Sequence, residues 1–192
     1  MKKLVSIIIC FMLVFGVFSC IQQSAFAQTQ ESGIYTYTVK NGEATIVNVD
    51  EFARGDITIP SELGGYPVTK IGSYAFSMSL FTSIVVPNSV TTIGDYAFDY
   101  SDIVSIKLSE NITKIKENTF EGCEYLKSID IPKNVTKISK NAFDGCESLQ
   151  EITIPKNVEK IGFRALSYCY SLKSINVDKD NEFSTIKKLF FK

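Results

Sequence analysis

The sequence has no histidine and no tryptophan among its 192 residues. Histidine is the commonest general base near neutral pH and the commonest metal ligand, so its absence excludes Ser-His-Asp and Cys-His catalytic arrangements. A Ser-Lys pair is not excluded by composition. Acidic and basic residues nearly balance, with 21 Asp and Glu against 20 Lys and Arg, which gives no indication of nucleic-acid binding. The composition therefore favours a protein that is not an enzyme and that needs no cofactor.

Long apolar runs are also rare, and the longest lies at the start of the chain. Two lysines, Lys2 and Lys3, precede the apolar segment Leu4 to Val17, and Ala25-Phe26-Ala27 follows as a possible cleavage site. This order is typical of a secretory signal peptide, and the apolar run is short for a membrane-spanning helix. We predict that residues 1–27 are a signal peptide and that the protein is secreted or held at the cell surface.

A competing interpretation concerns Cys20. The residues Gly16-Val17-Phe18-Ser19-Cys20 resemble a bacterial lipobox, in which this cysteine would carry the lipid anchor. Under both interpretations the protein is exported. They differ in whether the mature chain contacts a membrane, which we expect only through a lipid at Cys20.

Residues 28–55 predict a β-hairpin. Ile34 to Val39 and Ala44 to Val49 alternate in the manner of strands, and Asn41-Gly42 between them suits a type I′ turn. Because a repeat array leaves apolar surface exposed at its ends, we expect this hairpin to cap the segment that follows.

Residues 56–177 consist of near-copies of the segment Leu126 to Cys146 at a period of 22 to 23 residues, which is typical of a solenoid. Each copy begins with an alternating strand that a proline or serine ends, and a second short extended segment such as Val135 to Ile138 follows. Ile138, Ala142, Cys146 and Leu149 then show helical spacing. We predict an α/β repeat solenoid of about six units, with residues 178–192 as a C-terminal cap or truncated repeat. The strands are expected at Asp56–Pro60, Ser83–Pro87, Ser105–Ser109, Ser128–Pro132, Glu151–Pro155 and Ser174–Val177.

Cys123, Cys146 and Cys169 are 23 residues apart and so occupy one place in three successive units. An oxidising compartment would permit a disulfide. Three cysteines cannot all pair, however, so at least one would remain free. Counting from the phenylalanine also places Ser79 and Ser101 at the same position in two earlier units. We favour free, buried thiols that face the backbone of the turn.

The repeated pattern L-x-x-I-x-I-P-x-x-V-x-x-I-x-x-x-A-F-x-x-C resembles the BspA-type leucine-rich repeats of bacterial and protozoan surface proteins, over roughly Asp56 to Val177. The segment Asn41 to Ala44 is similar to the one that often precedes such repeats. The resemblance implies a right-handed curved solenoid outside the cell and a role in adhesion. The expected partner is an extracellular protein or glycan, and the expected state is a monomer.

Two surfaces are candidates for binding. By analogy with leucine-rich repeats, the open sheet is the first, although a solvated sheet would look the same and no aromatic or arginine anchor lies on it. Its candidate residues are Thr58, Val85, Lys107, Ser128, Asp130, Glu151, Thr153 and Asn176. The second is a stripe of lysines before and near the aligned isoleucine, which suits an anionic glycan or polymer but also an ordinary solvated face. It consists of Lys70, Lys114, Lys133, Lys137, Lys156 and Lys160.

Other polar groups are weaker candidates. Acids on the far side of the unit, among them Asp99, Glu121 and Asp144, form a patchy edge, and six tyrosines near it are interpreted as packing at the edge of the core. Asp178 to Glu182 alternates oxygen ligands but lacks the glycine and distal glutamate of a calcium loop. We predict no catalytic, cofactor or metal residue.

The sequence leaves three functions open. The first is an exported, adhesin-like interaction module. The second is a secreted inhibitor or accessory subunit that uses the sheet to cover an enzyme. The third is the repeat-only part of a larger surface protein or enzyme.

Overall fold

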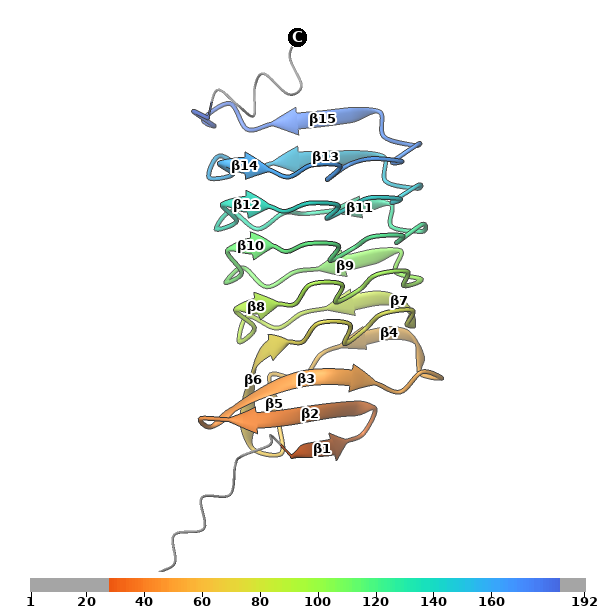
Figure 1. The fold of residues 1–192 in the computed structure, drawn as a ribbon, viewed down its shortest axis with the longest axis vertical. Coiled ribbons are helices and arrows are strands. Elements are labelled where there is room, and N and C mark those ends of the chain that lie inside the picture. Colours follow the sequence, from red (N-terminus) through yellow and green to blue (C-terminus); the bar gives the residue numbers. More distant parts are fainter. Residues whose placement is uncertain (1–27, 184–192) are drawn as a thin grey trace, which may run out of the picture.

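The computed structural model describes residues 28–183 as a stack of coils in which each coil lies directly on the next. Figure 1 shows strands of successive coils side by side along the whole stack. The predicted signal peptide, Cys20 and most of the predicted C-terminal segment lie outside the described residues. The prediction of about six repeat units is confirmed, because six coils each contribute one strand to the larger parallel sheet.

That sheet has the order β15-β13-β11-β9-β7-β4. In β11 the Ser128 side chain is exposed and Ile129 is buried, which is the alternation expected of a strand with one face on a core. Ser128 lies opposite Ser105 and Glu151 in the neighbouring strands, so like positions of successive repeats stand in one line. The strands are β4 (Arg54–Thr58), β7 (Leu80–Val85), β9 (Ser105–Lys107), β11 (Ser128–Ile129), β13 (Glu151–Ile154) and β15 (Ser174–Val177).

A smaller parallel sheet lies after the corner that follows each of these strands. Its strands are β10 (Lys114–Ile115), β12 (Lys137–Ile138) and β14 (Lys160–Ile161), each with the lysine outward and the isoleucine inward. The preceding coils continue this line with β6 (Tyr66–Ile71) and β8 (Thr92–Ile93), which pair with each other.

The corners between the two sheets are held by asparagines from several coils, which the sequence analysis did not single out. The side-chain amide of Asn134 donates to the carbonyl of Glu110 at 2.8 Å, and that of Asn157 donates to Lys133 at 2.7 Å. At the last corner the buried Asn181 donates to the carbonyls of Pro155 and Val158. Backbone acceptors that would otherwise lack partners at the corner are thereby satisfied.

The α/β prediction is wrong, because the structure has no helix within residues 28–183. In the coil that begins at Gly72, the N–H groups of Tyr74, Phe76 and Met78 donate to carbonyls of the next coil. The N–H groups between them donate to the residue three positions earlier, as Ser77 does to Tyr74 at 3.1 Å. A helix would direct every N–H to the fourth preceding residue of its own coil, and Tyr74 and Met78 have φ angles of 62° and 54° that end any helical run. The spacing of Ile138, Ala142, Cys146 and Leu149 therefore belongs to a series of turns.

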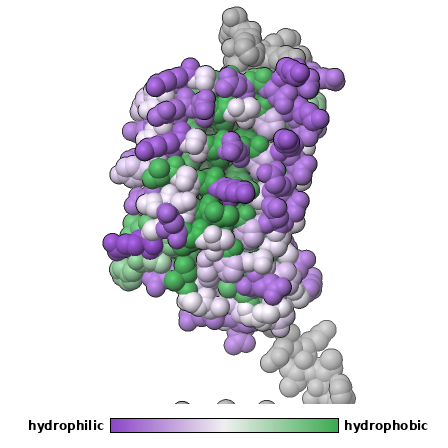
Figure 2. All heavy atoms as spheres, turned by 180° about the vertical axis from the view of Figure 1, so that it is seen from behind, coloured by the Kyte–Doolittle hydropathy of each residue, from purple (hydrophilic) through white to green (hydrophobic). Residues whose placement is uncertain are grey.

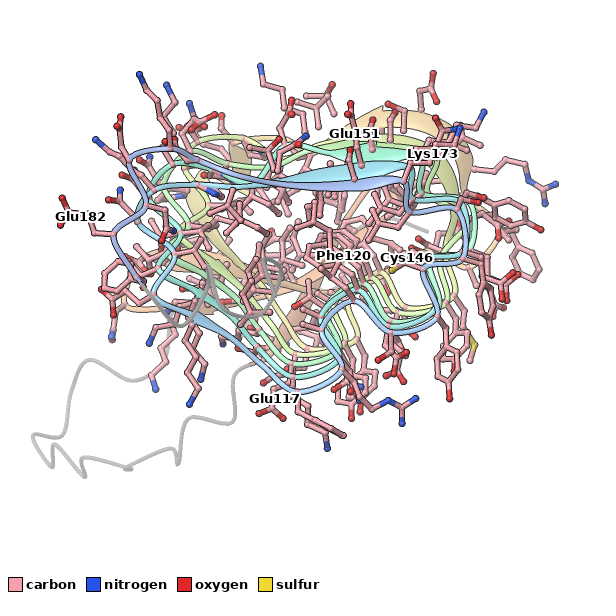
Figure 3. The ribbon with its side chains drawn as sticks, turned by 90° about the horizontal axis from the view of Figure 1, so that it is seen from above. Glu117, Phe120, Cys146, Glu151, Lys173 and Glu182 are labelled. Atoms are coloured by element: carbon pink, nitrogen blue, oxygen red, sulfur yellow. The ribbon has the colours of Figure 1, made fainter. Side chains whose placement is uncertain are left out.

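One continuous core fills the stack. Phe98, Phe120 and Phe143 lie one above another, with ring centroids 5.4 Å apart and nearly parallel planes. Figure 3, which looks along the stack, shows Phe120 and Cys146 inside the coil and Glu117 and Glu151 outside it. Since no coil could bury these rings alone, each coil depends on its neighbours for stability.

The N-terminal end contains the expected hairpin, made of β2 (Tyr35–Lys40) and β3 (Glu43–Val49) with positive φ angles at Asn41 and Gly42. β1 (Thr29–Ser32) pairs with β2, β3 pairs in parallel with β6, and β5 (Glu62–Leu63) pairs with β6. Tyr37 and Ile46 of the hairpin belong to the same buried cluster as the repeats. Its function as a cap stays a prediction.

Candidate functional site

The sheet face holds the first set of predicted binding residues in register. Thr58, Val85 and Lys107 lie opposite one another on β4, β7 and β9, as do Thr153 and Asn176 on β13 and β15. Asp130 follows the end of β11, and Ser128 pairs with Glu151. Of these eight residues, all but the half-buried Val85 are exposed.

This face is shallow. Its depression over β7, β9 and β11 encloses about 240 Å³. Figure 2, which looks onto this side of the stack, shows apolar residues between two hydrophilic margins. The isoleucines of the sheet are almost covered, with Ile106 and Ile129 exposing 7% and 5% of their surface. The sheet face therefore offers breadth and no pocket that would hold an anchoring side chain.

Three residues of the lysine stripe are also in register. Lys137 of β12 lies directly between Lys114 of β10 and Lys160 of β14. Neighbouring parallel strands are ~4.8 Å apart, so each pair of adjacent lysines in this column lies within one Debye length. Within the part of the chain that the structure describes, the stripe forms one ion pair, between Lys70 and Glu43 at 3.9 Å. Lys133 and Lys156 are exposed at the asparagine corner.

A third surface joins acids and tyrosines that the sequence analysis had treated separately. It is a depression of about 370 Å³ on the turns, and we call it the acid–tyrosine groove. The interpretation of the tyrosines as core-edge packing is wrong here, because Tyr100, Tyr168 and Tyr170 expose 55%, 54% and 73% of their surface. It is lined by Tyr100, Glu121, Gly122, Glu124, Asp144, Gly145, Glu147, Arg164, Tyr168 and Tyr170.

Glycine positions explain why this groove exists. Met78, Tyr100, Gly122, Gly145 and Tyr168 occupy the same place in five successive coils, and all five have a positive φ. The ring of Tyr100 lies over Gly122, and Gly145 leaves the space between that ring and Tyr168 without a side chain. This signal was available in the sequence, because glycine aligned at one repeat position indicates a left-handed turn.

The electrostatics of the groove centre on Asp144. This carboxylate is 5% exposed; its Oδ2 lies 3.2 Å from the guanidinium of Arg164, while Oδ1 is buried without a hydrogen-bond partner. Burial raises the pKa of Asp144, Arg164 opposes that shift, and Glu121 adds to it. Burial likewise raises the pKa of Asp99 two coils earlier, where Oδ1 also lacks a partner. A buried carboxylate oxygen without a hydrogen-bond partner is costly.

The cysteine column is confirmed as free thiols that face the backbone. Cys123, Cys146 and Cys169 donate to the carbonyls of Phe98, Phe120 and Phe143 of the preceding coils at 3.0 to 3.2 Å. Ser101 continues the column, with its hydroxyl 3.4 Å from the Cys123 sulfur. Burial raises the pKa of the Cys123 thiol to about 12 and that of Cys169 to about 11, which disfavours the nucleophilic thiolate.

The remaining candidates are structural. In the segment Asp178 to Glu182, Asp178 Oδ1 accepts from the N–H of Asp180, and Asn181 turns into the core. Among residues 28–183 no group of three or more His, Cys, Asp and Glu is placed to hold a metal ion. A depression of about 1080 Å³ lies between the hairpin and Ser77–Leu80, away from every predicted site residue. Across the same described residues, no helix has the length and apolar character needed to cross a membrane.

Solved structures with this arrangement come from bacterial proteins. A leucine rich cell surface protein from Faecalibacterium prausnitzii is 34% identical, with a TM-score of 0.72 over 79% of this chain and 40% of that protein. A leucine-rich repeat protein from Bacteroides ovatus is 32% identical, with a TM-score of 0.70 over 77% of this chain and 40% of that protein. The T. pallidum leucine rich repeat protein is 25% identical, with a TM-score of 0.71 over 77% of this chain and 71% of that protein.

The chain thus spans 40% of the length of the first two of these relatives. A comparison with curated proteins finds no match. The profile of the BspA type leucine rich repeat region matches residues 69–192 in six copies, which is more than half of the sequence. This chain therefore belongs to the BspA-type leucine-rich repeat family.

Proposed function

We propose that this protein is an exported, non-enzymatic and adhesin-like binding module that attaches through its lysine stripe to an anionic extracellular glycan or polymer. The observation that carries the proposal is the register of Lys114, Lys137 and Lys160 on three adjacent strands. Like charges so close repel one another, and an anionic partner relieves that repulsion at every coil. The regular spacing suits a polymer whose charges also repeat.

Further observations support this function. The relative from Faecalibacterium prausnitzii is described as a cell surface protein, and the sequence of residues 1–27 has the order of a signal peptide. The buried thiols, whose raised pKa values keep them protonated, offer no nucleophile. The repeats build a rigid scaffold for surface side chains, which is typical of binding proteins.

The sheet face is a weaker candidate for the same function. Its residues from Thr58 to Asn176 are in register, but the face is shallow. No exposed residue on its six strands is aromatic, and their single arginine, Arg54, lies at the start of the edge strand β4. Binding energy at protein interfaces concentrates in aromatic and arginine anchors. We expect substitutions on this face to have smaller effects than substitutions in the lysine stripe.

Retention on immobilised heparin, an anionic glycan, tests the proposal. The variant Lys137→Gln/Lys160→Gln is compared with Lys127→Gln/Lys173→Gln, which removes the same charge from exposed lysines outside the stripe. We expect the stripe variant to bind heparin ~10-fold more weakly than the wild type, and the control variant to bind within about twofold. Equal weakening of both variants would mean that only net charge matters and would contradict the proposal, as would no retention of the wild type at low salt.

A further inference from the structure

The acid–tyrosine groove contains an arginine of the chain itself, which shows how a cationic side chain sits there. The guanidinium of Arg164 pairs with Asp144 Oδ2 and lies 5.1 Å from the centre of the Tyr168 ring. A carboxylate on one side and an aromatic face on the other is a favourable environment for a guanidinium, through a charge-assisted contact and a cation–π contact.

Arg164 does not saturate the groove. Four carboxylates, Glu121, Glu124, Asp144 and Glu147, line it with this one guanidinium, which leaves a formal charge of −3 when all four are ionised. Among the described residues, none of Glu121, Glu124 and Glu147 forms an ion pair. Glu124 and Glu147 are exposed, so their carboxylates are open to the groove. The groove thus has acceptors for at least one further cationic group.

The tyrosines provide the contact area that charge alone would not. Tyr100 and Tyr168 bound the groove along the stack, and Tyr170 packs edge-on against Tyr168 with ring centroids 6.0 Å apart. Exposed tyrosines are rigid and contribute strongly to protein–protein contacts. Gly145 keeps the floor open, since a Cβ placed there would meet nothing closer than the backbone of Gly122 at 3.5 Å.

We infer that the acid–tyrosine groove is a second binding site, which accepts a lysine or arginine side chain from a basic segment of a protein partner. The site lies on the turns and does not include any residue of the lysine stripe, so it stands independently of the proposed function. Its unpaired carboxylates and open tyrosine faces are complementary to a guanidinium or ammonium group on an extended peptide.

A labelled oligoarginine peptide tests this inference, with binding measured by fluorescence anisotropy at low ionic strength. The variant Glu124→Gln/Glu147→Gln changes two exposed groove carboxylates, and Glu110→Gln/Glu159→Gln changes two exposed acids elsewhere. We expect the affinity to fall ~10-fold in the groove variant and by less than about twofold in the control. A Tyr168→Ala variant should also weaken binding, because it removes the aromatic wall while leaving every charge in place.

Three results would overturn the inference. They are no binding of oligoarginine by the wild type, equal loss in the groove and control variants, and an unchanged affinity in the groove variant. A second copy of the chain is the alternative partner, and sedimentation of the unlabelled protein tests for it. If the wild type self-associates, and if both the groove variant and Lys137→Gln/Lys160→Gln abolish that self-association, the groove binds another copy of this chain instead. Circular dichroism checks that each variant keeps the fold of the wild type.

Discussion

Two columns of residues, only two positions apart in each coil, behave in opposite ways. The inner column is phenylalanine in four successive coils, Phe76, Phe98, Phe120 and Phe143, whereas the outer column reads Met78, Tyr100, Gly122, Gly145 and Tyr168. The inner side chains stack on themselves and are almost completely buried. The outer ones share only a backbone conformation, and their side chains range from none to a tyrosine. Stacking therefore determines the interior, while the surface two residues away is free to vary with the partner.

Breaking the inner column should have the largest effect. Replacing Phe120 with alanine opens a cavity between Phe98 and Phe143, which we expect to lower the free energy of unfolding by about 3–5 kcal/mol. Urea denaturation followed by circular dichroism measures this change. The matched variant Phe143→Leu imitates Leu166 of the next coil and should cost less than about 1.5 kcal/mol. A cost for Phe120→Ala as small as that of the matched variant would show that the rings do not support one another.

Adding a side chain at a glycine of the outer column should destabilise the protein less than breaking the inner column does, and it should weaken oligoarginine binding. Gly145→Ala places a side chain on a backbone with a φ of 76°, which costs roughly 1–2 kcal/mol. Gly145→Tyr adds a ring like those of Tyr100 and Tyr168, at a similar cost in the free energy of unfolding, and it occupies the space between them. We expect this variant to remain folded at 25 °C and to lose oligoarginine binding in the anisotropy measurement. If Gly145→Tyr binds the peptide as well as the wild type does, the open floor is not part of the site.

The smallest expected effect concerns Asp99, which lies between the two columns. Burial raises the pKa of this carboxyl in the folded state, opposed by Ser77. Because protonation then favours the folded state, the ionised carboxylate destabilises the protein above the folded pKa, and the penalty disappears below the unfolded pKa. Asp99→Asn should therefore raise the melting temperature slightly at pH 7, with a difference from the wild type that closes as the pH falls below 4. A constant difference across this pH range would rule out ionisation as the cause.

The interior was largely predictable because its buried residues recur at the same position of every repeat. The period gave the six strands, the paired isoleucines gave the buried face, and the alignment of Ser101 with Cys123 correctly indicated thiols facing the backbone. The predicted helix failed because spacings of three and four residues are also produced by turns whose alternate N–H groups bond to the next coil. Nothing in the sequence of a single unit distinguishes a helix from such a series of turns. The corner asparagines, Asn134 and Asn157 among them, could have been found from their constant place after the strand.

The acid–tyrosine groove was harder to predict because it depends on contacts between different coils. Glu124 and Glu147 are aligned in the sequence, but the groove also needs Arg164 from the next coil to lie against Asp144 and Tyr168. The direction of these side chains follows from the residues with positive φ in the turns. The predicted helix contains no such residues, so it could not place these side chains correctly. The register of Lys114, Lys137 and Lys160 follows from the alignment of the repeats alone, so it could be predicted from the sequence.

The most direct test of this account measures two ligands on two variants in one set of titrations. Wild type, Lys137→Gln/Lys160→Gln and Glu124→Gln/Glu147→Gln are each titrated with heparin and with oligoarginine. We expect the lysine variant to lose heparin affinity and keep oligoarginine affinity, and the glutamate variant to lose oligoarginine affinity and keep heparin affinity. If each variant changes both affinities in proportion to its net charge, the two surfaces are not separate sites, and the account is contradicted.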